Sequence, residues 1–160
     1  MEDWRRIDID ALEPDTHLSA EDLIPQLPPV SYEQIQQVSQ QVRSSLSSGQ
    51  FVVALQLALD NPPYVADAKT KELHGETLFE ILCSIKNNHH PNDYKQIISQ
   101  LSQQQQDTLV KYLYRAMSTP YGAKQGGLIL TWFEKTVELT GLGPIVRFIT
   151  DRRTVWVASR

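Results

Sequence analysis

The sequence has a single cysteine, Cys83, so it cannot form an intramolecular disulfide. This fits the reducing interior of a cell, where disulfides are rare. The longest apolar run, FVVAL, is far shorter than the roughly 20 residues of a membrane-spanning helix, and the acidic N-terminus is unlike a signal peptide. The net charge of −4 argues against the basic face that nucleic-acid binders carry. We therefore expect an intracellular protein with no membrane span and no nucleic-acid partner.

Basic residues are scarce in the first 30 positions, which hold eight acids but only two bases, Arg5 and Arg6. The rest of the chain holds 13 bases and 11 acids and is close to neutral. Four of the nine prolines lie in residues 11–30, where their fixed φ and missing N–H disfavour a continuous helix or a central strand. We predict an extended acidic arm and linker over residues 1–30, a helical domain over residues 31–155, and a tail over residues 156–160 of unassigned role.

The sequence after residue 30 has the spacing and the start signals of helices. Ser31 with Gln34 and Ser102 with Gln105 fit capping boxes, and Pro144 fits the first position of a last helix with Ile145, Phe148 and Ile149 as its apolar face. The segment QFVVALQLALD is apolar at eight of eleven positions, which is typical of a buried helix. We predict an all-α fold of about seven short helices, packed around this central apolar helix and without a fixed repeat period.

The histidines do not suggest a metal or acid–base site. His89 and His90 are adjacent in a polar loop bounded by Pro91, and they lack the partner four residues away that a zinc-binding helix needs. His74 stands alone with acids two residues to either side, so we expect it on the surface or at the rim of the core. We predict no metal and no cofactor.

The other reactive groups also favour structural roles. Cys83 lies among apolar residues of a helix with no base placed near it, so we expect a buried structural thiol. Asp8 and Asp10 lack the rigid pocket that a catalytic carboxylate pair requires. Arg152 and Arg153 follow the last helix, where cations interact favourably with the terminal carbonyls. We find no catalytic set of residues and predict that the protein is not an enzyme.

The first ten residues contain the one period-two pattern of the chain, Ile7-Asp8-Ile9-Asp10, which is typical of a strand with one buried face. Trp4, Ile7 and Ile9 cannot bury themselves on their own acidic segment. They either fold back onto the helical body or dock on another protein as an extended peptide. We favour docking on another protein.

Five segments also resemble, in order, a known family: RRIDID, ALQLALDNPP, KYLYRAMSTP, LTWFEK and GLGPIVRFITDRRTV. They are similar to segments of subunit 5 of the actin-related protein 2/3 complex, and the two ends look especially like fungal members. The similarity covers most of residues 4–155, except for the proline-rich linker. It implies an α-α superhelix-like bundle around a central apolar helix, and a non-catalytic subunit of a hetero-heptameric machine that nucleates branched actin filaments.

The resemblance also implies partners and a place in the cell. In the family, the helical body seats on subunit 4 near the β-propeller subunit 1, and the N-terminal arm reaches the actin-related protein 2 subunit. Actin filaments are contacted only through the complex, in the cytoplasm and in cortical actin patches. Transferred to this chain, the contact motif of the arm falls on Arg5, Arg6, Ile7, Asp8, Ile9 and Asp10. An alternative is a free helical adaptor module that binds a peptide in a groove.

Overall fold

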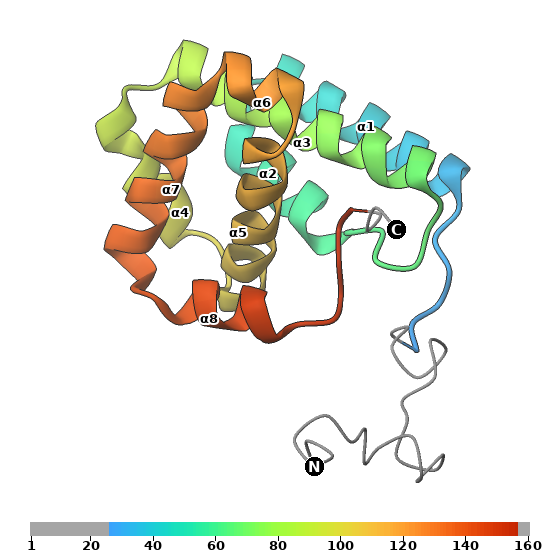
Figure 1. Ribbon diagram of the computed structural model, residues 1–160. Coiled ribbons are helices and arrows are strands. Elements are labelled where there is room, and N and C mark those ends of the chain that lie inside the picture. The colour runs from blue at the N-terminus through green and yellow to red at the C-terminus, as the bar shows by residue number, and fades with distance from the viewer. Residues whose placement is uncertain (1–25, 157–160) are drawn as a thin grey trace, which may run out of the picture.

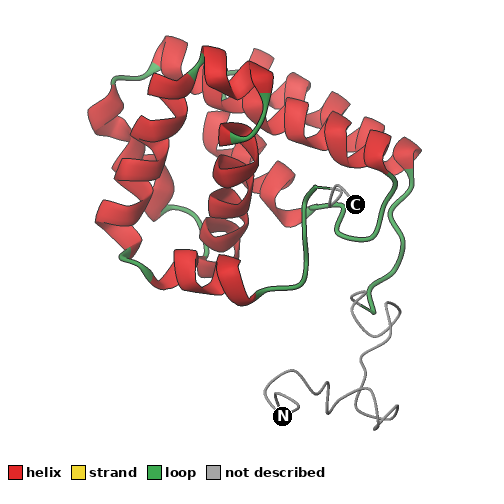
Figure 2. Ribbon diagram, in the orientation of Figure 1, coloured by secondary structure: helices red, strands yellow, loops and turns green. Residues whose placement is uncertain are grey.

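The computed structural model describes residues 26–156, and these residues form helices and loops but no strand (Figure 2). Eight α-helices and one short 3-10 helix follow one another along this part of the chain. They are α1 (Tyr32–Ser47), α2 (Phe51–Asp60), α3 (Ala68–Asn88), η4 (Pro91–Asp93), α4 (Tyr94–Ser99), α5 (Gln103–Met117), α6 (Pro120–Lys124), α7 (Gly126–Thr140) and α8 (Gly143–Thr150). The predicted all-α fold is confirmed.

The helices form two groups that meet at α5 (Figure 1). In the first group, α1, α2 and α3 pack against one another, and α1 and α3 lie side by side. In the second, α7 packs between α4 and α5, and α8 crosses the lower end of α5. Because α5 also contacts α2, α3 and α6, it joins both groups into one array.

Side-chain caps explain where several of these helices begin. Ser31 and Ser102 both form the predicted capping boxes, with Gln34 and Gln105 as the reciprocal partners. Asp67 accepts a hydrogen bond from the Thr70 amide at the start of α3, and Thr119 does the same for Gly122 in α6. Side-chain caps that lie close by in the sequence therefore mark the starts of four of the eight α-helices of the described chain.

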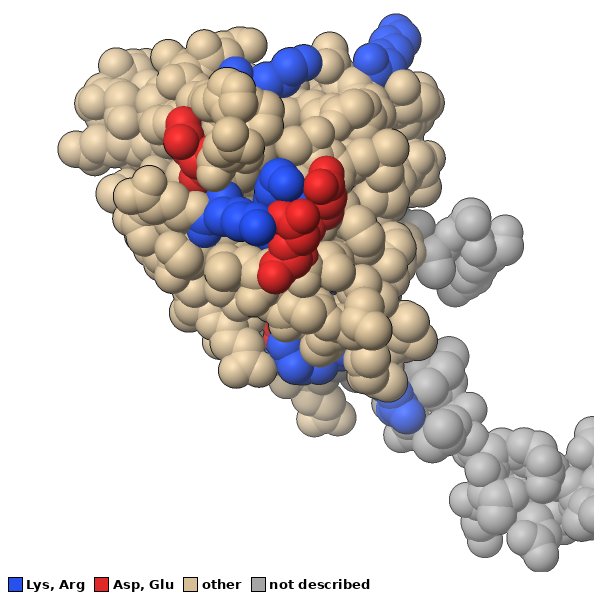
Figure 3. Space-filling view, turned by 90° about the vertical axis from the view of Figure 1, so that its left-hand side faces the viewer, with Lys and Arg blue, Asp and Glu red and all other residues tan. Residues whose placement is uncertain are grey.

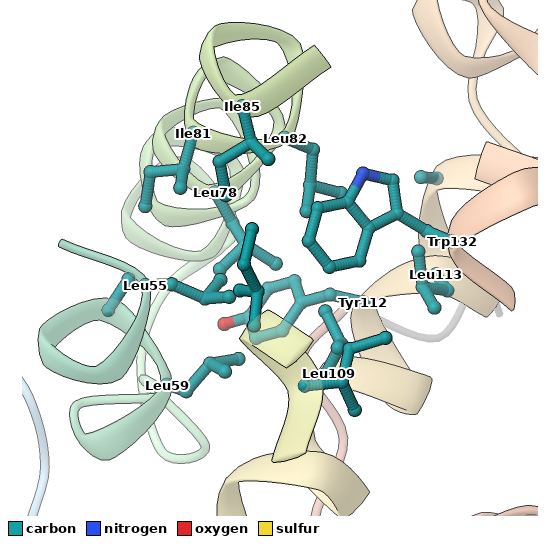
Figure 4. Close-up of a cluster of buried hydrophobic side chains, with 14 of the residues drawn as sticks. Leu55, Leu59, Leu78, Ile81, Leu82, Ile85, Leu109, Tyr112, Leu113 and Trp132 are labelled. Atoms are coloured by element: carbon teal, nitrogen blue, oxygen red, sulfur yellow. The ribbon is translucent and has the colours of Figure 1, made fainter. Parts of the chain in front are cut away.

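The main core lies where α2, α3, α5 and α7 face one another (Figure 4). Its largest buried side chain is Trp132 of α7, whose ring stacks on Tyr94 of α4 at 4.5 Å between centroids. Leucines and isoleucines from α2, α3 and α5 fill the space around Tyr112, as the close-up shows: Leu55, Leu59, Leu78, Ile81, Leu82, Ile85, Leu109 and Leu113. Burying aliphatic side chains of this size contributes roughly 1.5–3 kcal/mol each.

The structure adds one short helix and corrects two details of the predicted helices. Pro120 begins the short helix α6, which the Thr119 hydroxyl caps. The helix over residues 51–60 is not enclosed on all sides, since Val53 is 50% exposed. Ile149 does not face the core, because it is 72% exposed.

Candidate protein-binding surface

Large apolar side chains are exposed along one side of α8. Leu142, Val146 and Ile149 are 67%, 58% and 72% exposed. Their spacing of four and three residues places them within about a third of the helix circumference. We call these three residues the α8 stripe. Leu130 and Leu139 of α7 are also exposed, so five of the nine exposed large hydrophobic residues of the described chain lie between positions 130 and 149.

The opposite side of α8 holds the helix against α5. Pro144 is buried, and the ring of Phe148 stacks on Tyr114 of α5 with 4.4 Å between centroids and 4° between planes. The guanidinium of Arg147 donates to both carboxylate oxygens of Asp107, at 2.6 and 2.8 Å. Such two-pronged pairs fix geometry as well as adding energy. The contacts with α5 therefore fix the orientation of the helix that carries the α8 stripe.

The charged residue of α8 and several charged residues of α4 and α7 are paired within the molecule. Arg147 is the only charged residue of α8. On α4 and α7, Lys95 and Lys135 both bind Glu138, and Lys135 also binds Glu134. Figure 3, which looks onto the side where α4 and α7 lie, shows basic and acidic side chains together in the middle of a largely uncharged surface. This part of the surface thus has little net charge to attract or repel a partner.

Cations from α3 and α5 hold the irregular segment after α8. Lys71 of α3 donates to the carbonyl oxygens of Thr154 and Trp156, at 3.2 and 3.3 Å. Lys111 of α5 donates to the carbonyl of Arg153, and Arg115 to that of Val155. Four successive carbonyls are therefore bound by cations from α3 and α5. We call residues 151–156 the C-terminal strap.

The strap begins with an ion pair that is largely shielded from water. Lys111 lies 2.6 Å from the Asp151 carboxylate, and only 4% of the Lys111 side chain is exposed. Burial raises the pKa of Asp151, but hydrogen bonds from Arg153 and Lys111 outweigh it and keep this pKa well below its ordinary value. Burial and the nearby Arg115 lower the pKa of Lys71. The strap is thus tied to α5 by charge as well as by the burial of Val155.

His74 is where the structure departs most from the sequence prediction. It is fully buried, and its Nε2 lies 3.0 Å from the Ala58 carbonyl while Nδ1 lies 2.6 Å from the Tyr112 hydroxyl. Burial lowers the pKa of His74 to about 4, so the ring is neutral at pH 7. A neutral ring satisfies both contacts if Nε2 donates to the carbonyl and the hydroxyl donates to Nδ1. The prediction of a surface or rim position is wrong.

The other residues considered from the sequence have structural surroundings where the structure describes them. Cys83 is half-buried, and burial raises the pKa of its thiol, which disfavours the reactive thiolate. Arg153 pairs with the Asp151 carboxylate at the end of α8 and lies over the Tyr64 ring. Arg5, Arg6, Ile7, Asp8, Ile9 and Asp10 lie outside the described residues.

The acidic residues, histidines and cysteine of the described chain do not form a group of metal ligands. Within residues 26–156 no three His, Cys, Asp or Glu side chains come together as metal ligands. A hollow of about 610 Å³ beside α5 and α8 contains Asp107 and Asp151, but both carboxylates are bound by cations. None of the described helices has the length and apolar character needed to cross a membrane.

Comparison with known proteins decides the family. Residues 3–155 match the family described as "ARP2/3 complex 16 kDa subunit (p16-Arc)". The chain belongs to the p16-Arc family. A relative from Saccharomyces cerevisiae, "Actin-related protein 2/3 complex subunit 5", is 44% identical over 96% of this chain and 98% of its own length. The family consists of structural subunits without a catalytic role, which confirms the prediction that the chain is not an enzyme.

More distant p16-Arc relatives share most of the same region. "Actin-related protein 2/3 complex subunit 5-C" of Xenopus laevis is 30% identical over 72% of this chain and 74% of its own length. "Actin-related protein 2/3 complex subunit 5" of Dictyostelium discoideum is 28% identical over 72% of this chain and 79% of its own length. The resemblance read from the five segments is confirmed, and the high identity to the yeast protein is consistent with a fungal member.

Proposed function

We propose that this chain is a structural subunit of the actin-related protein 2/3 complex, which nucleates branched actin filaments. Its helical body anchors on subunit 4 and near the β-propeller subunit 1. Its N-terminal arm tethers the actin-related protein 2 subunit. The chain meets actin filaments only through the complex, and it acts in the cytoplasm, at cortical actin patches.

The extent of the family match carries this proposal. The match begins at residue 3, so it includes the segment with Arg5, Arg6, Ile7, Asp8, Ile9 and Asp10 as well as the helical body. The yeast relative likewise aligns with 96% of the chain. A segment that only connected two parts of the chain would not need the apolar side that two isoleucines alternating with two acids create. These observations support a role for the arm that is separate from the fold of the body.

The physical role we propose for the linker is to raise a local concentration. Twenty extended residues span at most about 65 Å, and a flexible chain of this length averages nearer 25 Å between its ends. Once the body is anchored, binding of the arm becomes an intramolecular event at an effective concentration near the millimolar range. The actin-related protein 2 subunit can then move between inactive and active positions without leaving the complex.

Within the arm, charged and apolar residues have different tasks. Arg5 and Arg6 pair with an acidic surface of the partner, whereas Ile7 and Ile9 fill shallow apolar pockets. This is the usual division between residues that steer binding and residues that supply most of its free energy. In an extended peptide the acids Asp8 and Asp10 lie on the side opposite Ile7 and Ile9.

Deletion of residues 1–12 tests the tether. We expect the trimmed chain to enter the complex, while the complex loses part of its actin-related protein 2 subunit and nucleates more slowly in an actin polymerisation assay. A finer pair of variants is Ile7→Ser/Ile9→Ser, with Leu18→Ser/Leu23→Ser as the control outside the motif. Full content of the second subunit and full nucleation after the deletion would contradict the tether.

Size-exclusion chromatography of native extract tests the assembly itself. We expect the chain to elute with a large complex that contains the other subunits. Elution as a monomer would instead favour a free helical adaptor, and the proposed function would be wrong.

A further inference from the structure

We infer that the α8 stripe, formed by Leu142, Val146 and Ile149, docks into an uncharged apolar groove on another subunit of the complex. This inference rests on the proposed function, and it names the surface by which the helical body is anchored. It concerns the body alone and is independent of the arm.

The exposure of the stripe calls for a partner. A surface helix of an isolated domain normally turns its apolar side to the core and its polar side to water. Val146 and Ile149 of α8 and its N-cap residue Leu142 are instead exposed, Ile149 to 72%. Contiguous exposed apolar residues of this kind mark interaction sites more often than chance exposure.

The arrangement of the stripe indicates how it is received. Residues spaced by four and then three positions form the row that an amphipathic helix lays into a groove on its partner. Two of the three residues are β-branched, and their side chains have few rotamers to lose on binding. The partner is therefore expected to offer an elongated groove rather than a flat or convex surface.

Charge complementarity narrows the chemistry of the groove. Arg147, the one charged residue of α8, is already paired with Asp107, and Lys95 of α4 and Lys135 of α7 are paired with Glu138. If the groove were charged, its charges would lose their hydration on binding, and α8 has no unpaired opposite charge to compensate for this cost. An uncharged, aliphatic groove loses nothing and buries apolar surface on both sides.

The support behind α8 favours binding as well. The stack of Phe148 on Tyr114, the Arg147–Asp107 pair and the C-terminal strap hold the helix in place before the partner arrives. Since little ordering remains to be done, less of the interaction energy is lost on association. This distinguishes α8 from a loosely attached terminal helix.

The occupant we propose is another subunit rather than a second copy of this chain. The family is named as one subunit of a complex of different proteins. A second copy would have to offer a complementary groove of its own, yet the hollow of about 610 Å³ beside α5 and α8 is lined by charged and polar groups. The oligomeric state of the isolated chain is therefore part of the test.

The test uses the full chain, expressed in cells in place of the natural copy. The variant Val146→Glu/Ile149→Glu introduces two charges into the stripe. Val53→Glu is the matched control, because Val53 is also aliphatic and 50% exposed but lies on α2, outside the stripe. The measurement is the amount of each chain that co-purifies with the other subunits, identified by mass spectrometry, relative to its total amount.

We expect the double variant to enter the complex at least about tenfold less than the parent chain, because truncating or charging central interface residues typically costs a factor of this size or more. Val53→Glu should be incorporated normally. Thermal unfolding by circular dichroism checks that both variants fold. If the double variant does not fold, Val146→Ser/Ile149→Ser replaces it, with a smaller loss of the same direction.

Three results would overturn the inference, and they can be told apart. Equal incorporation of the double variant and the parent chain would refute the role of the stripe and leave the proposed function standing. A dimer of the isolated chain that Ile149→Glu converts to monomer, with assembly intact, would assign the stripe to a second copy. Absence of the parent chain itself from the complex would refute the proposed function together with this inference.

Discussion

His74 links the stability of the fold to pH. Its ring lies between the carbonyl of Ala58 in α2 and the hydroxyl of Tyr112 in α5, so it joins three helices in the middle of the core. Burial lowers the pKa of this histidine to about 4. An unfolded histidine titrates near 6.5, so the unfolded chain takes up this proton at a higher pH than the folded chain.

We predict that the free energy of unfolding falls by about 3 kcal/mol as the pH is lowered from 6.5 to 4, because only the unfolded state gains a proton on His74 in this range. Urea unfolding followed by circular dichroism at several pH values measures this fall. In His74→Gln the contribution of residue 74 is removed and the curve should be flatter over the same range. An unchanged slope in His74→Gln would show that other groups cause the pH dependence.

The same residue shows what the sequence could have revealed. His74 precedes Leu78, Ile81 and Ile85 by four, seven and eleven residues, which places it on the apolar side of α3. The acids at positions 72 and 76 lie on other sides of the helix and therefore say little about position 74. The hydrogen bonds to Ala58 and Tyr112, in contrast, depend on how three helices meet and leave no local pattern.

At the scale of elements, two ion pairs between α5 and the α8 region differ mainly in their access to water. The Lys111–Asp151 pair is almost enclosed, whereas the side chains of Arg147 and Asp107 are 44% and 21% exposed. Removing one partner of a buried pair leaves an uncompensated charge or a group of unbound carbonyls. When one partner of an exposed pair is removed, water solvates the remaining charge and replaces much of the lost interaction.

We predict that Lys111→Met destabilises the protein by about 3 kcal/mol, and that Arg147→Met, the same change at the exposed pair, costs about 1 kcal/mol or less. Chemical unfolding of the two isolated variants measures both values. Loss of Lys111 also frees the Arg153 carbonyl and leaves the strap with fewer ties. Equal effects of the two substitutions would contradict the distinction between buried and exposed pairs drawn here.

The helices themselves were largely predictable, and the strap was not. Ser31, Asp67 and Ser102 cap helices as their local sequence indicates, because a cap involves only residues within one turn. Ile149 was predicted to lie on the apolar side of α8 that faces α5, but it is exposed. An apolar residue on a short helix can pack either into the core or against a partner, and the sequence does not distinguish the two. The strap depends on Lys71, Lys111 and Arg115, which lie 40 to 85 residues away in the sequence.

At the scale of the whole molecule, the arm and the body differ in the forces available to them. Residues 1–30 hold eight acids and two arginines, whereas the body is close to neutral and offers the uncharged α8 stripe. Contacts between exposed charges weaken as salt shortens the screening distance from about 10 Å at 0.1 M to about 3 Å at 1 M. Burial of apolar surface is not weakened in this way.

We predict that rising salt separates the two attachments of the chain. If the proposed contact of Arg5 and Arg6 holds the actin-related protein 2 subunit, this subunit should dissociate from the immobilised complex at a lower salt concentration than the helical body. Stepwise washes between about 0.1 and 1 M salt, analysed by gel electrophoresis, measure the order of loss. Release of both at the same step would show that the arm and the body are not held by different forces.

The sequence indicated the presence of an arm through its charge, its prolines and the alternation of Ile7 to Asp10. It could not indicate the proposed partner surface, because a surface on another polypeptide leaves no pattern in this sequence. The resemblance to a known family supplied this partner, and the family is confirmed while the contact of the arm stays a prediction. A contact between two subunits depends on both of their sequences, so one sequence alone does not reveal it.

The placement of the three tryptophans gives the molecule built-in optical reporters. Trp132 is sealed in the core against Tyr94, Trp156 lies near Phe148 at the end of the strap, and Trp4 belongs to the arm by its position in the sequence. If any two of them are replaced by phenylalanine, one tryptophan remains. Its emission maximum and its quenching then report on the surroundings of that one region. Core melting, strap release and arm engagement could then be timed separately in one chain, without attaching a dye.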